Sequence, residues 1–303
     1  MTSTASRVGV PRGMSRRGVA LAFLLPAIVV LGAFNFWPMF EALRLSFTDA
    51  SGFGRATFVG FDNYIAVFTD PRIVHSMGNT LLYSAIFTPV SVVLALTLAL
   101  ALNHPRLPLR AALRTGLFLP FIVSLAVSAF AWQYLLDPRV GLLNFWLRNA
   151  GLSIGNVFQD PALAMPAVAL IAAWKSFPFY MVVFLAGLQD IPPTLYEAAR
   201  VDGASPWARF RHITVPLLGN TTGFVLVIAT IAALQAFDQI YILTGGGPYR
   251  STQTVVMQIY ESGFKNLELG FASALSYVLL FATLLLGLLQ FALAGRRGKG
   301  ATS

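Results

Sequence analysis

The chain has 303 residues, of which 56% are hydrophobic and only 11% are charged, and it contains no cysteine. Soluble domains usually carry about a quarter charged residues, so this composition argues against a water-soluble globule. Without cysteine, this sequence has no disulfide scaffold, zinc–thiolate site, iron–sulfur cluster or cysteine nucleophile. The formal net charge of +9 would suggest nucleic acid in a soluble protein, so its distribution along the chain decides its meaning.

Long segments with almost no charge recur along the chain. A bilayer core about 30 Å thick needs roughly 20 apolar residues in a helix. Helices of that length in soluble cores are rare and usually amphipathic. The sequence therefore predicts an all-α, polytopic membrane protein with six transmembrane helices, at residues 18–40, 76–102, 114–136, 162–188, 214–242 and 269–294. The six-span domain covers residues 18–295, and the polar tails are residues 1–17 and 296–303.

The first apolar stretch follows Arg16 and Arg17, as the apolar region of a secretion signal does. It is longer than such a region, and it ends in Trp37-Pro38 where a signal has a small-residue cleavage site. We therefore expect a retained helix.

The loops differ in charge. Both tails and the loops after the second and fourth spans are rich in arginine, whereas the opposite loops carry about as many acidic as basic residues. Because basic residues favour the cytoplasmic side, we expect both termini in the cytoplasm. The positive charge then reflects topology and attraction to anionic lipids, and no nucleic-acid partner is expected.

The outer loops carry two recognisable pieces. The loop after the third span contains an amphipathic stretch at residues 141–147, which we expect to lie at the membrane interface. The last outer loop opens with Gly245-Gly246-Gly247-Pro248, a sequence that stops a helix sharply.

The second cytoplasmic loop, residues 189–216, is the most informative segment. Thr194 is the predicted cap of a short helix at residues 195–201, and Gly203 can end that helix in a left-handed conformation. Ser205 and the proline after it start a second helix. Several apolar side chains remain on this cytoplasmic segment, so it needs a protein partner: Leu195, Ala198, Ala199, Val201, Trp207 and Phe210.

This segment resembles the signature loop of the membrane subunits of binding-protein-dependent ABC importers. Glu197-Ala198-Ala199 is followed by Gly203 and then, after nine residues, by Ile213 and Val215-Pro216, with valine where the family has leucine. The resemblance implies the type I ABC importer permease fold and a loop that docks onto a cytoplasmic ATPase subunit. It assigns that contact to Glu197, Ala198, Ala199, Asp202, Gly203 and Pro216.

Other stretches are similar to the sugar-permease branch of this family, among them residues 59–64, Trp174-Lys175 and residues 244–248. The branch implies a second, different permease subunit, two ATPase subunits and an extracytoplasmic binding protein, in the bacterial inner membrane. Its members import di- and oligosaccharides, and one subgroup imports glycerol 3-phosphate and glycerophosphodiesters. We expect carbohydrate import by ATP-driven alternating access, with the phosphate esters as the alternative.

Nothing in the sequence predicts an enzyme. Gly298-Lys299 lacks the first glycine of a phosphate loop, so ATP and Mg²⁺ are expected on partner subunits and no cofactor on this chain. His75, His104 and His212 fall at different membrane edges, so no metal site is expected. An ion-coupled secondary carrier is a more distant alternative, but it predicts inverted repeats and several carboxylates within the membrane.

Two charges within the predicted spans, Lys175 and Asp238, are candidates for the substrate pathway, because such charges usually face a cavity or a partner. Structural pairing of Lys175 and helix capping by Asp238 are the alternatives. For a phosphate ester, the Lys175 ammonium would offset the cost of burying the phosphate. Amide and aromatic candidates, each of which taken alone fits a packing or interface role better than a ligand role, are Trp132, Gln133, Tyr134, Trp174, Phe177, Tyr180, Gln235, Gln239 and Tyr241.

Overall fold

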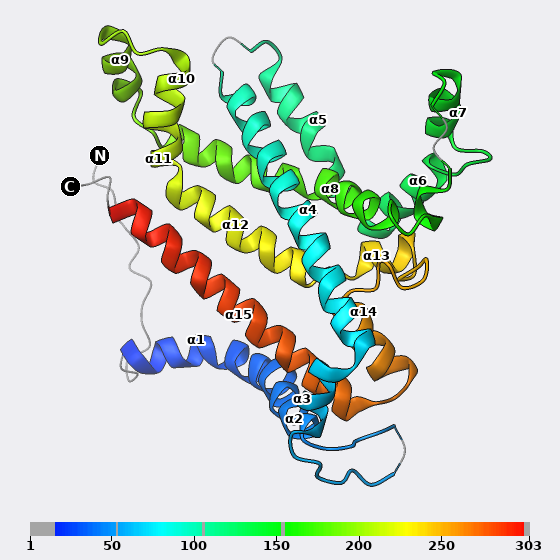
Figure 1. Cartoon of the computed structure of the whole chain (residues 1–303). Coiled ribbons are helices and arrows are strands. Elements are labelled where there is room, and N and C mark those ends of the chain that lie inside the picture. The colour runs from blue at the N-terminus through cyan, green and yellow to red at the C-terminus, as the bar shows by residue number, and fades with distance from the viewer. Residues whose placement is uncertain (1–15, 53, 105–106, 153–154, 300–303) are drawn as a thin grey trace, which may run out of the picture.

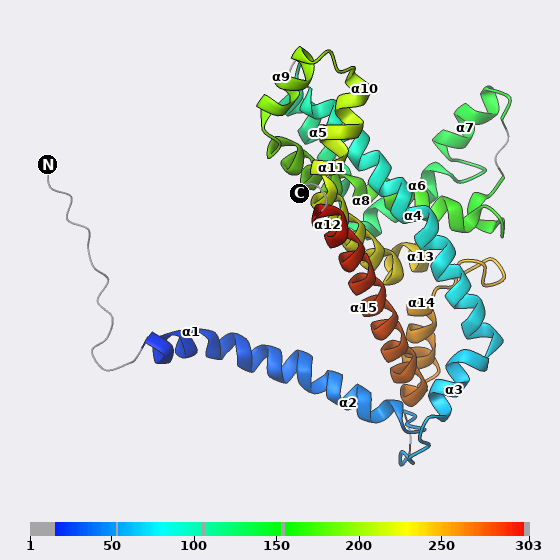
Figure 2. The same ribbon diagram turned by 60° about the vertical axis from the view of Figure 1, so that its left-hand side comes forward.

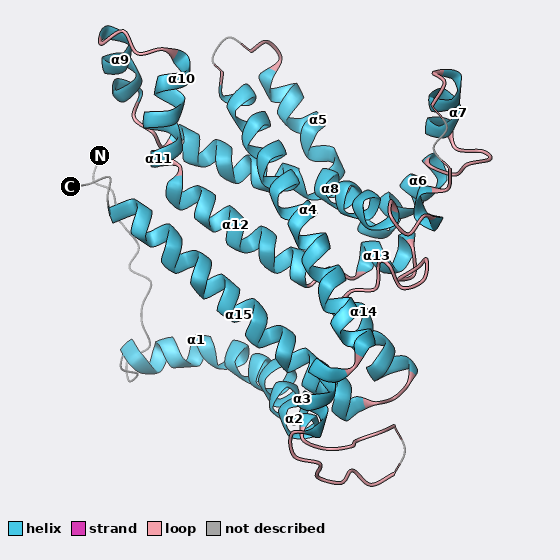
Figure 3. Cartoon of the chain, in the orientation of Figure 1, coloured by secondary structure: helices cyan, strands magenta, loops and turns pink. Residues whose placement is uncertain are grey.

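A computed structural model describes residues 16–52, 54–104, 107–152 and 155–299 of the chain. These residues form an all-helical bundle, in which loops join long helices (Figures 1 and 3). Four of the helices are long and apolar enough to cross a membrane, and there are up to six such spans if each of two sharply bent helix pairs counts as one.

Two long helices, α4 (Pro71–Asn103) and α8 (Ala164–Gln189), form the centre of the bundle. Their facing surfaces carry buried alanines as well as large side chains such as Tyr83 and Phe184. Small residues let two helix backbones approach closely, which is how helices associate inside a membrane. The α4–α8 pair is the frame onto which the other spans pack.

Helices α12 (Gly219–Leu234) and α15 (Leu269–Lys299) complete this part of the bundle. The Gln290 side chain on α15 donates a hydrogen bond of 2.9 Å to the hydroxyl of Thr230 on α12. A polar contact of this kind fixes the register of two apolar helices.

The first helix extends beyond its predicted range. It consists of α1 (Arg16–Leu31), a π-helical turn (Gly32–Phe36) and α2 (Trp37–Ser46), whereas the sequence predicted a span of residues 18–40. The α2 part packs on α15, where the Tyr277 hydroxyl donates to the carbonyl of Met39 at 2.6 Å. The α1 part diverges from the bundle, and the most apolar stretch of this span has no buried residue (Figure 2).

The third span is not the straight helix that the sequence predicted at residues 114–136. Helix α5 (Arg110–Ile122) and helix α6 (Leu125–Leu135) meet at an angle of 94°. Val123 and Ser124 have extended backbones between them, with ψ of 136° and 141°. The break is only two residues long, one apolar and one a serine, so the hydropathy of the surrounding stretch gave no sign of it.

The fifth span, predicted at residues 214–242, is also interrupted. Its entry consists of α10 (Pro206–Arg209), a π-helical turn (Phe210–Thr214) and α11 (Val215–Leu217), which together meet α12 at 65°. The helix then stops at Leu234, and the chain resumes as the short helix α13 (Asp238–Leu243).

Short helices occupy the two ends of the bundle. One end carries α9 (Pro193–Val201) and α10 (Figure 1). The other end carries α3 (Asp62–Thr69), α7 (Leu142–Asn149), a 3₁₀ turn (Val157–Gln159), α14 (Val255–Tyr260) and a π-helical turn (Glu261–Lys265). The buried Asn144 side chain anchors α7 by donating to the carbonyl of Leu136 at 2.6 Å. The tail at residues 1–15 and residues 300–303 lie outside the described residues.

Candidate functional site

The first part of the segment at residues 189–216 is α9, and the end of this helix is fixed by backbone hydrogen bonds. Ala204 N–H donates to the carbonyl of Ala199 at 2.9 Å, and Gly203 N–H donates to Arg200 at 3.1 Å. Gly203 has a φ of +75°, as a glycine that closes a helix in this way requires. At the start of α9 the predicted cap was wrong: Pro192 occupies the N-cap position, Thr194 lies inside the helix, and no side chain caps it.

The second part is α10, which Ser205 starts as predicted. Its hydroxyl accepts a hydrogen bond from Ala208 N–H at 3.2 Å, and proline follows at the first helical position. A hydrogen bond of 2.9 Å between the hydroxyls of Tyr196 and Thr214 joins α9 to the π-helical turn after α10. The two parts are therefore held as one unit at the end of the fifth span.

The outward surface of this unit is apolar with a few unpaired charges. Val201 is 88% exposed and Trp207 is 66% exposed, and Leu195 is exposed beside them. Glu197 and Asp202 are exposed, and neither forms an ion pair or a hydrogen bond through its side chain within the described residues. Ala198, Gly203 and Pro216 are exposed and Ala199 is half-buried. Glu197, Ala198, Ala199, Asp202 and Gly203, which the resemblance assigned to ATPase contact, thus lie in one unit, whereas Pro216 lies in α11.

Lys175 lies in α8, half-buried, against the broken end of α5. Its Nζ is 3.4 Å from the carbonyl oxygen of Phe121 and 5.7 Å from the centre of that ring. The last carbonyls of a helix lack intrahelical partners and carry partial negative charge, so a cation is favourable there. Phe179 stacks on the same ring at 5.7 Å, so α8 holds the end of α5 through two side chains.

Asp238 lies in the first turn of α13, directly after the interruption, and is exposed. A carboxylate in the first turn of a helix is stabilised by the free N–H groups there. No ion pair joins Asp238 to Lys175 in the part of the chain that the structure describes. Gln235 is exposed within the interruption and Gln239 is half-buried one residue further along α13.

Trp132 and Trp174 come together although they belong to different spans. Their rings meet edge to face, with centres 5.3 Å apart. Both line a largely apolar groove of about 760 Å³ between α6, α8 and the loop before α8. Phe177 and Tyr180 on α8 are buried in the core. They line neither this groove nor the second groove described next.

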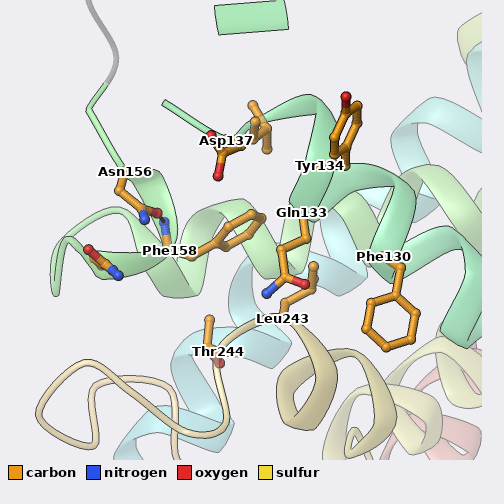
Figure 4. A pocket seen from close by; sticks show the side chains of 10 residues that line it. Phe130, Gln133, Tyr134, Asp137, Asn156, Phe158, Leu243 and Thr244 are labelled. Atoms are coloured by element: carbon orange, nitrogen blue, oxygen red, sulfur yellow. Dashed lines mark hydrogen bonds between the residues drawn. The ribbon is translucent and has the colours of Figure 1, made fainter. Parts of the chain in front are cut away.

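Gln133 and Tyr134 line a second groove, of about 560 Å³, and the Gln133 side chain points toward the other lining residues (Figure 4). The sequence prediction missed the groove's other polar residues, Asn156, Gln159 and Thr244, because they lie in loops where amides and hydroxyls are ordinary. Asp137 also lines it, and hydrogen bonds from the backbone N–H groups of Val140 and Arg139 hold the pKa of that carboxyl below its usual value.

Tyr241 belongs to an aromatic cluster. It stacks on Phe237 at 5.3 Å and meets Tyr260 edge to face at 5.5 Å. The ammonium of Lys265 lies 6.0 Å from the Tyr241 ring centre and 5.7 Å from that of Tyr260. This cation was missed as a site residue, because its position in an outer loop gave no sign that it faces a ring. The pathway candidates thus fall into separate groups and do not form one cluster.

Comparison with known proteins identifies the fold and the family. The family model described as "Binding-protein-dependent transport system inner membrane component" matches residues 91–299. Over 280 residues, 90% of this chain and 94% of the relative, the chain is 37% identical to the sn-glycerol-3-phosphate transport system permease protein UgpA of Brucella abortus biovar 1. It is 35% identical over 287 residues to the protein of that name from Yersinia pestis, across 94% of this chain and 97% of the relative.

Solved structures agree. A subunit of a bacterial ABC transporter involved in import of the acidic polysaccharide alginate superposes with a TM-score of 0.80 and 26% identity, over 92% of this chain and 95% of that chain. A second structure of a bacterial alginate ABC transporter, in complex with alginate pentasaccharide-bound periplasmic protein, gives the same TM-score and identity over 93% and 95%. The expected type I importer permease fold is confirmed, and the chain belongs to the family of binding-protein-dependent transport system inner membrane components.

Proposed function

We propose that this chain is the permease subunit of an importer for sn-glycerol 3-phosphate or a glycerophosphodiester, the alternative that the sequence raised. The observation that carries the proposal is the 37% identity to sn-glycerol-3-phosphate permeases over 90% of the chain. The sequence favoured a carbohydrate, and the similarity to an alginate importer keeps an oligosaccharide as the second candidate. Both relatives' cargoes, a phosphate ester and an acidic polysaccharide, are anions rich in hydroxyl groups.

The transport cycle we propose is ATP-driven alternating access, with ATP and Mg²⁺ bound by two cytoplasmic ATPase subunits. The chain's own contribution is the unit formed by α9 and α10. Its exposed apolar side chains offer area for docking, and the bond between Tyr196 and Thr214 ties it to the entry of the fifth span. A shift of the docked unit therefore moves the bent helix pair α11–α12, because the parts are short and directly connected.

The partner within the membrane is, in this proposal, a second and different permease subunit. Helix α1 supports it, because its large apolar side chains stand away from the chain's own bundle (Figure 2). Outside the cell, an extracytoplasmic binding protein delivers the cargo, as the complex of the alginate importer with its periplasmic protein suggests. Both termini lie in the cytoplasm, on the side of α9 and α10.

Within the pathway, we assign the anionic group of the cargo to Lys175. Within the described residues its ammonium donates to one neutral group, the Phe121 carbonyl at 3.4 Å, and its half-exposed side chain leaves further N–H groups available. Bringing a phosphate into a low-dielectric passage is costly unless a cation offsets it. The hydroxyl groups of the cargo would meet the amides and rings of Trp132, Trp174, Gln133 and Tyr134, which line the grooves beside α6.

The test is uptake of labelled sn-glycerol 3-phosphate, a glycerophosphodiester and a disaccharide by the complete importer. We expect the wild type to take up the phosphate esters. Lys175→Gln should reduce that uptake at least tenfold, and Lys175→Arg should restore part of it, because the charge is retained. Arg55→Gln in the first outer loop, which is exposed, is the matched control and should change nothing.

Two results would contradict these assignments. Uptake of the disaccharide alone by the wild type would reject the phosphate esters as cargo. An equal loss of every cargo in Lys175→Gln would make Lys175 only the support of the α5 end.

A further inference from the structure

The loop between α13 and α14, residues 244–254, is unusually well fixed for an outer loop. The Asn79 side chain on α4 donates to the carbonyls of Arg250 and Gln253, at 2.8 and 3.0 Å. The Thr80 hydroxyl accepts from Val255 N–H at 2.9 Å. Two consecutive residues of α4 thus hold the end of the loop that leads into α14.

The loop is also braced from within. The hydroxyl of Thr252, which is fully buried, donates to the carbonyl of Gly247 at 2.8 Å and lies 2.7 Å from the Thr244 hydroxyl. The buried Thr254 hydroxyl donates to Ala236 at 3.1 Å. The hydroxyls of Thr244, Thr252 and Thr254 are therefore paired at the two ends of the loop and give the tip a fixed base.

The tip, residues 248–250, presents two large side chains on a strained backbone. Tyr249 is 92% exposed and has a φ of +48°, and the exposed Arg250 that follows has a φ of +62°. A left-handed conformation is unfavourable for a residue with a side chain, and glycine would avoid the cost. Strain of this kind persists where the surrounding structure imposes it, and it concentrates at binding and switch sites.

The tip projects from the end of the bundle that carries α7 and α14, away from α9 and α10 (Figures 1 and 2). The charge of Arg250 contributes to lowering the pKa of Asp70, the residue before α4, after the larger effect of the hydrogen bond from Arg72. The tip therefore lies beside the outer end of a central span and on the side from which a binding protein approaches.

We propose that residues 248–250 are a rigid contact for the extracytoplasmic binding protein, with the Tyr249 ring and the Arg250 guanidinium as its main binding groups. The proposal rests on the proposed function, because it needs such a partner. Tyrosine and arginine are the residue types that most often carry the binding energy of an interface. A preformed loop loses little conformational entropy on binding, so its contacts convert efficiently into affinity.

The competing occupant is the membrane interface, where tyrosine and arginine are also frequent. A surface anchor would not need a fixed backbone, whereas a docking contact gains from one. A membrane anchor and a docking contact can be distinguished experimentally, because only a docking contact would be shielded by the binding protein and affect its stimulation of ATP hydrolysis.

The first test titrates the complete importer in proteoliposomes with its binding protein and measures ATP hydrolysis. Tyr249→Gly removes the ring and relieves the strained backbone, so the variant should fold at least as well as the wild type. We expect about tenfold more binding protein for half-maximal stimulation, with unchanged basal hydrolysis, and a smaller shift for Arg250→Ala. Leu109→Gly, which relieves a φ of +53° at an exposed residue on the cytoplasmic side, is the control and should leave the titration unchanged.

The second test uses the absence of cysteine from the chain. In Tyr249→Cys, a water-soluble maleimide should label this subunit, and saturating binding protein should slow the labelling at least fivefold. Unchanged titration of Tyr249→Gly, labelling that ignores the binding protein, or a cysteine already shielded by the bilayer would each overturn the inference while leaving the proposed function intact. A wild-type importer that no binding protein stimulates would overturn both.

Discussion

Gly203 is the single residue on which the geometry of the α9–α10 unit, the proposed ATPase contact, depends most. Its φ of +75° suits glycine, and a Cβ atom there would meet nothing within 4 Å. A substitution is therefore opposed by the backbone alone, at a cost of roughly 1–2 kcal/mol and more for a β-branched residue. That cost is enough to redirect α10 without preventing membrane insertion.

We expect Gly203→Val to reduce transport at least tenfold while the amount of assembled importer and its affinity for the binding protein remain normal. The measurement is uptake in cells, normalised to the importer recovered from membranes. Gly116→Val is the matched control, because Gly116 also has open space around it but a helical backbone. Equal uptake by both variants would show that this turn does not transmit the ATPase movement.

Residue chemistry predicted the turn at Gly203 and the cap at Ser205, though not the start of α9, because these signals are local. Ser205 caps the helix that starts one residue later, and Gly203 ends the helix that stops two residues earlier. The partner of Lys175 could not be predicted in the same way. Phe121 is 54 residues away in the chain, and its carbonyl is available only because α5 ends in the middle of a span.

At the scale of elements, the crossing of α8 and α12 controls the bent fifth span. A Cβ atom on Gly187 would lie 2.5 Å from the Thr221 hydroxyl oxygen and 3.1 Å from a methyl group of Leu218. Leu218 is the residue at which the 65° bend occurs. A side chain at position 187 therefore acts directly on the bend.

We expect Gly187→Leu to separate the two helices, to destabilise the importer by about 1–3 kcal/mol and to impair transport. The measurement is the temperature at which the detergent-solubilised importer loses its monodisperse chromatographic peak, followed by uptake. Gly287→Leu tests the same substitution in α15 at a position with nothing within 4 Å, and it should match the wild type. Identical melting of the two variants would mean that the α8–α12 contact adapts without cost.

The long spans were predictable and their interruptions were not, for one physical reason. Hydropathy sums side-chain character over a window, and the break at Val123 and Ser124 hardly changes that sum. Dihedral angles change there instead, and they are stabilised by contacts from α8 that the local sequence does not contain. The candidates for the substrate pathway were separated by these breaks, which turn α6 and α13 away from the helix axes assumed in the sequence prediction.

At the scale of the whole molecule, the family could be inferred from one segment, because the residue types and spacing at residues 197–216 are specific. The cargo could not, because the candidate groups belong to at least three places: the α5 end, the grooves beside α6, and the cluster around Tyr241. A complete cavity forms in this proposal only with the second permease subunit, toward which α1 extends.

Orientation in the membrane determines whether any of these assignments can hold. The chain places the α9–α10 unit and the C-terminal end of α15 at one end of the bundle, and that end has the arginine-rich loops (Figure 1). Basic loops are retained on the cytoplasmic side during insertion. We expect a reporter that is active only in the cytoplasm to work when it is fused after Ser303 or inserted between residues 107 and 110.

The same reporter should be inactive when it is inserted between residues 149 and 152, beyond the end of α7. That insertion is the internal control, because it tests the opposite end of the bundle in the same chain. Activity at residues 149–152 together with silence after Ser303 would reverse the topology. Glu197 and the apolar side chains around it would then face away from every ATPase, and the Tyr249 tip would face the cytoplasm, so both docking assignments would fall together.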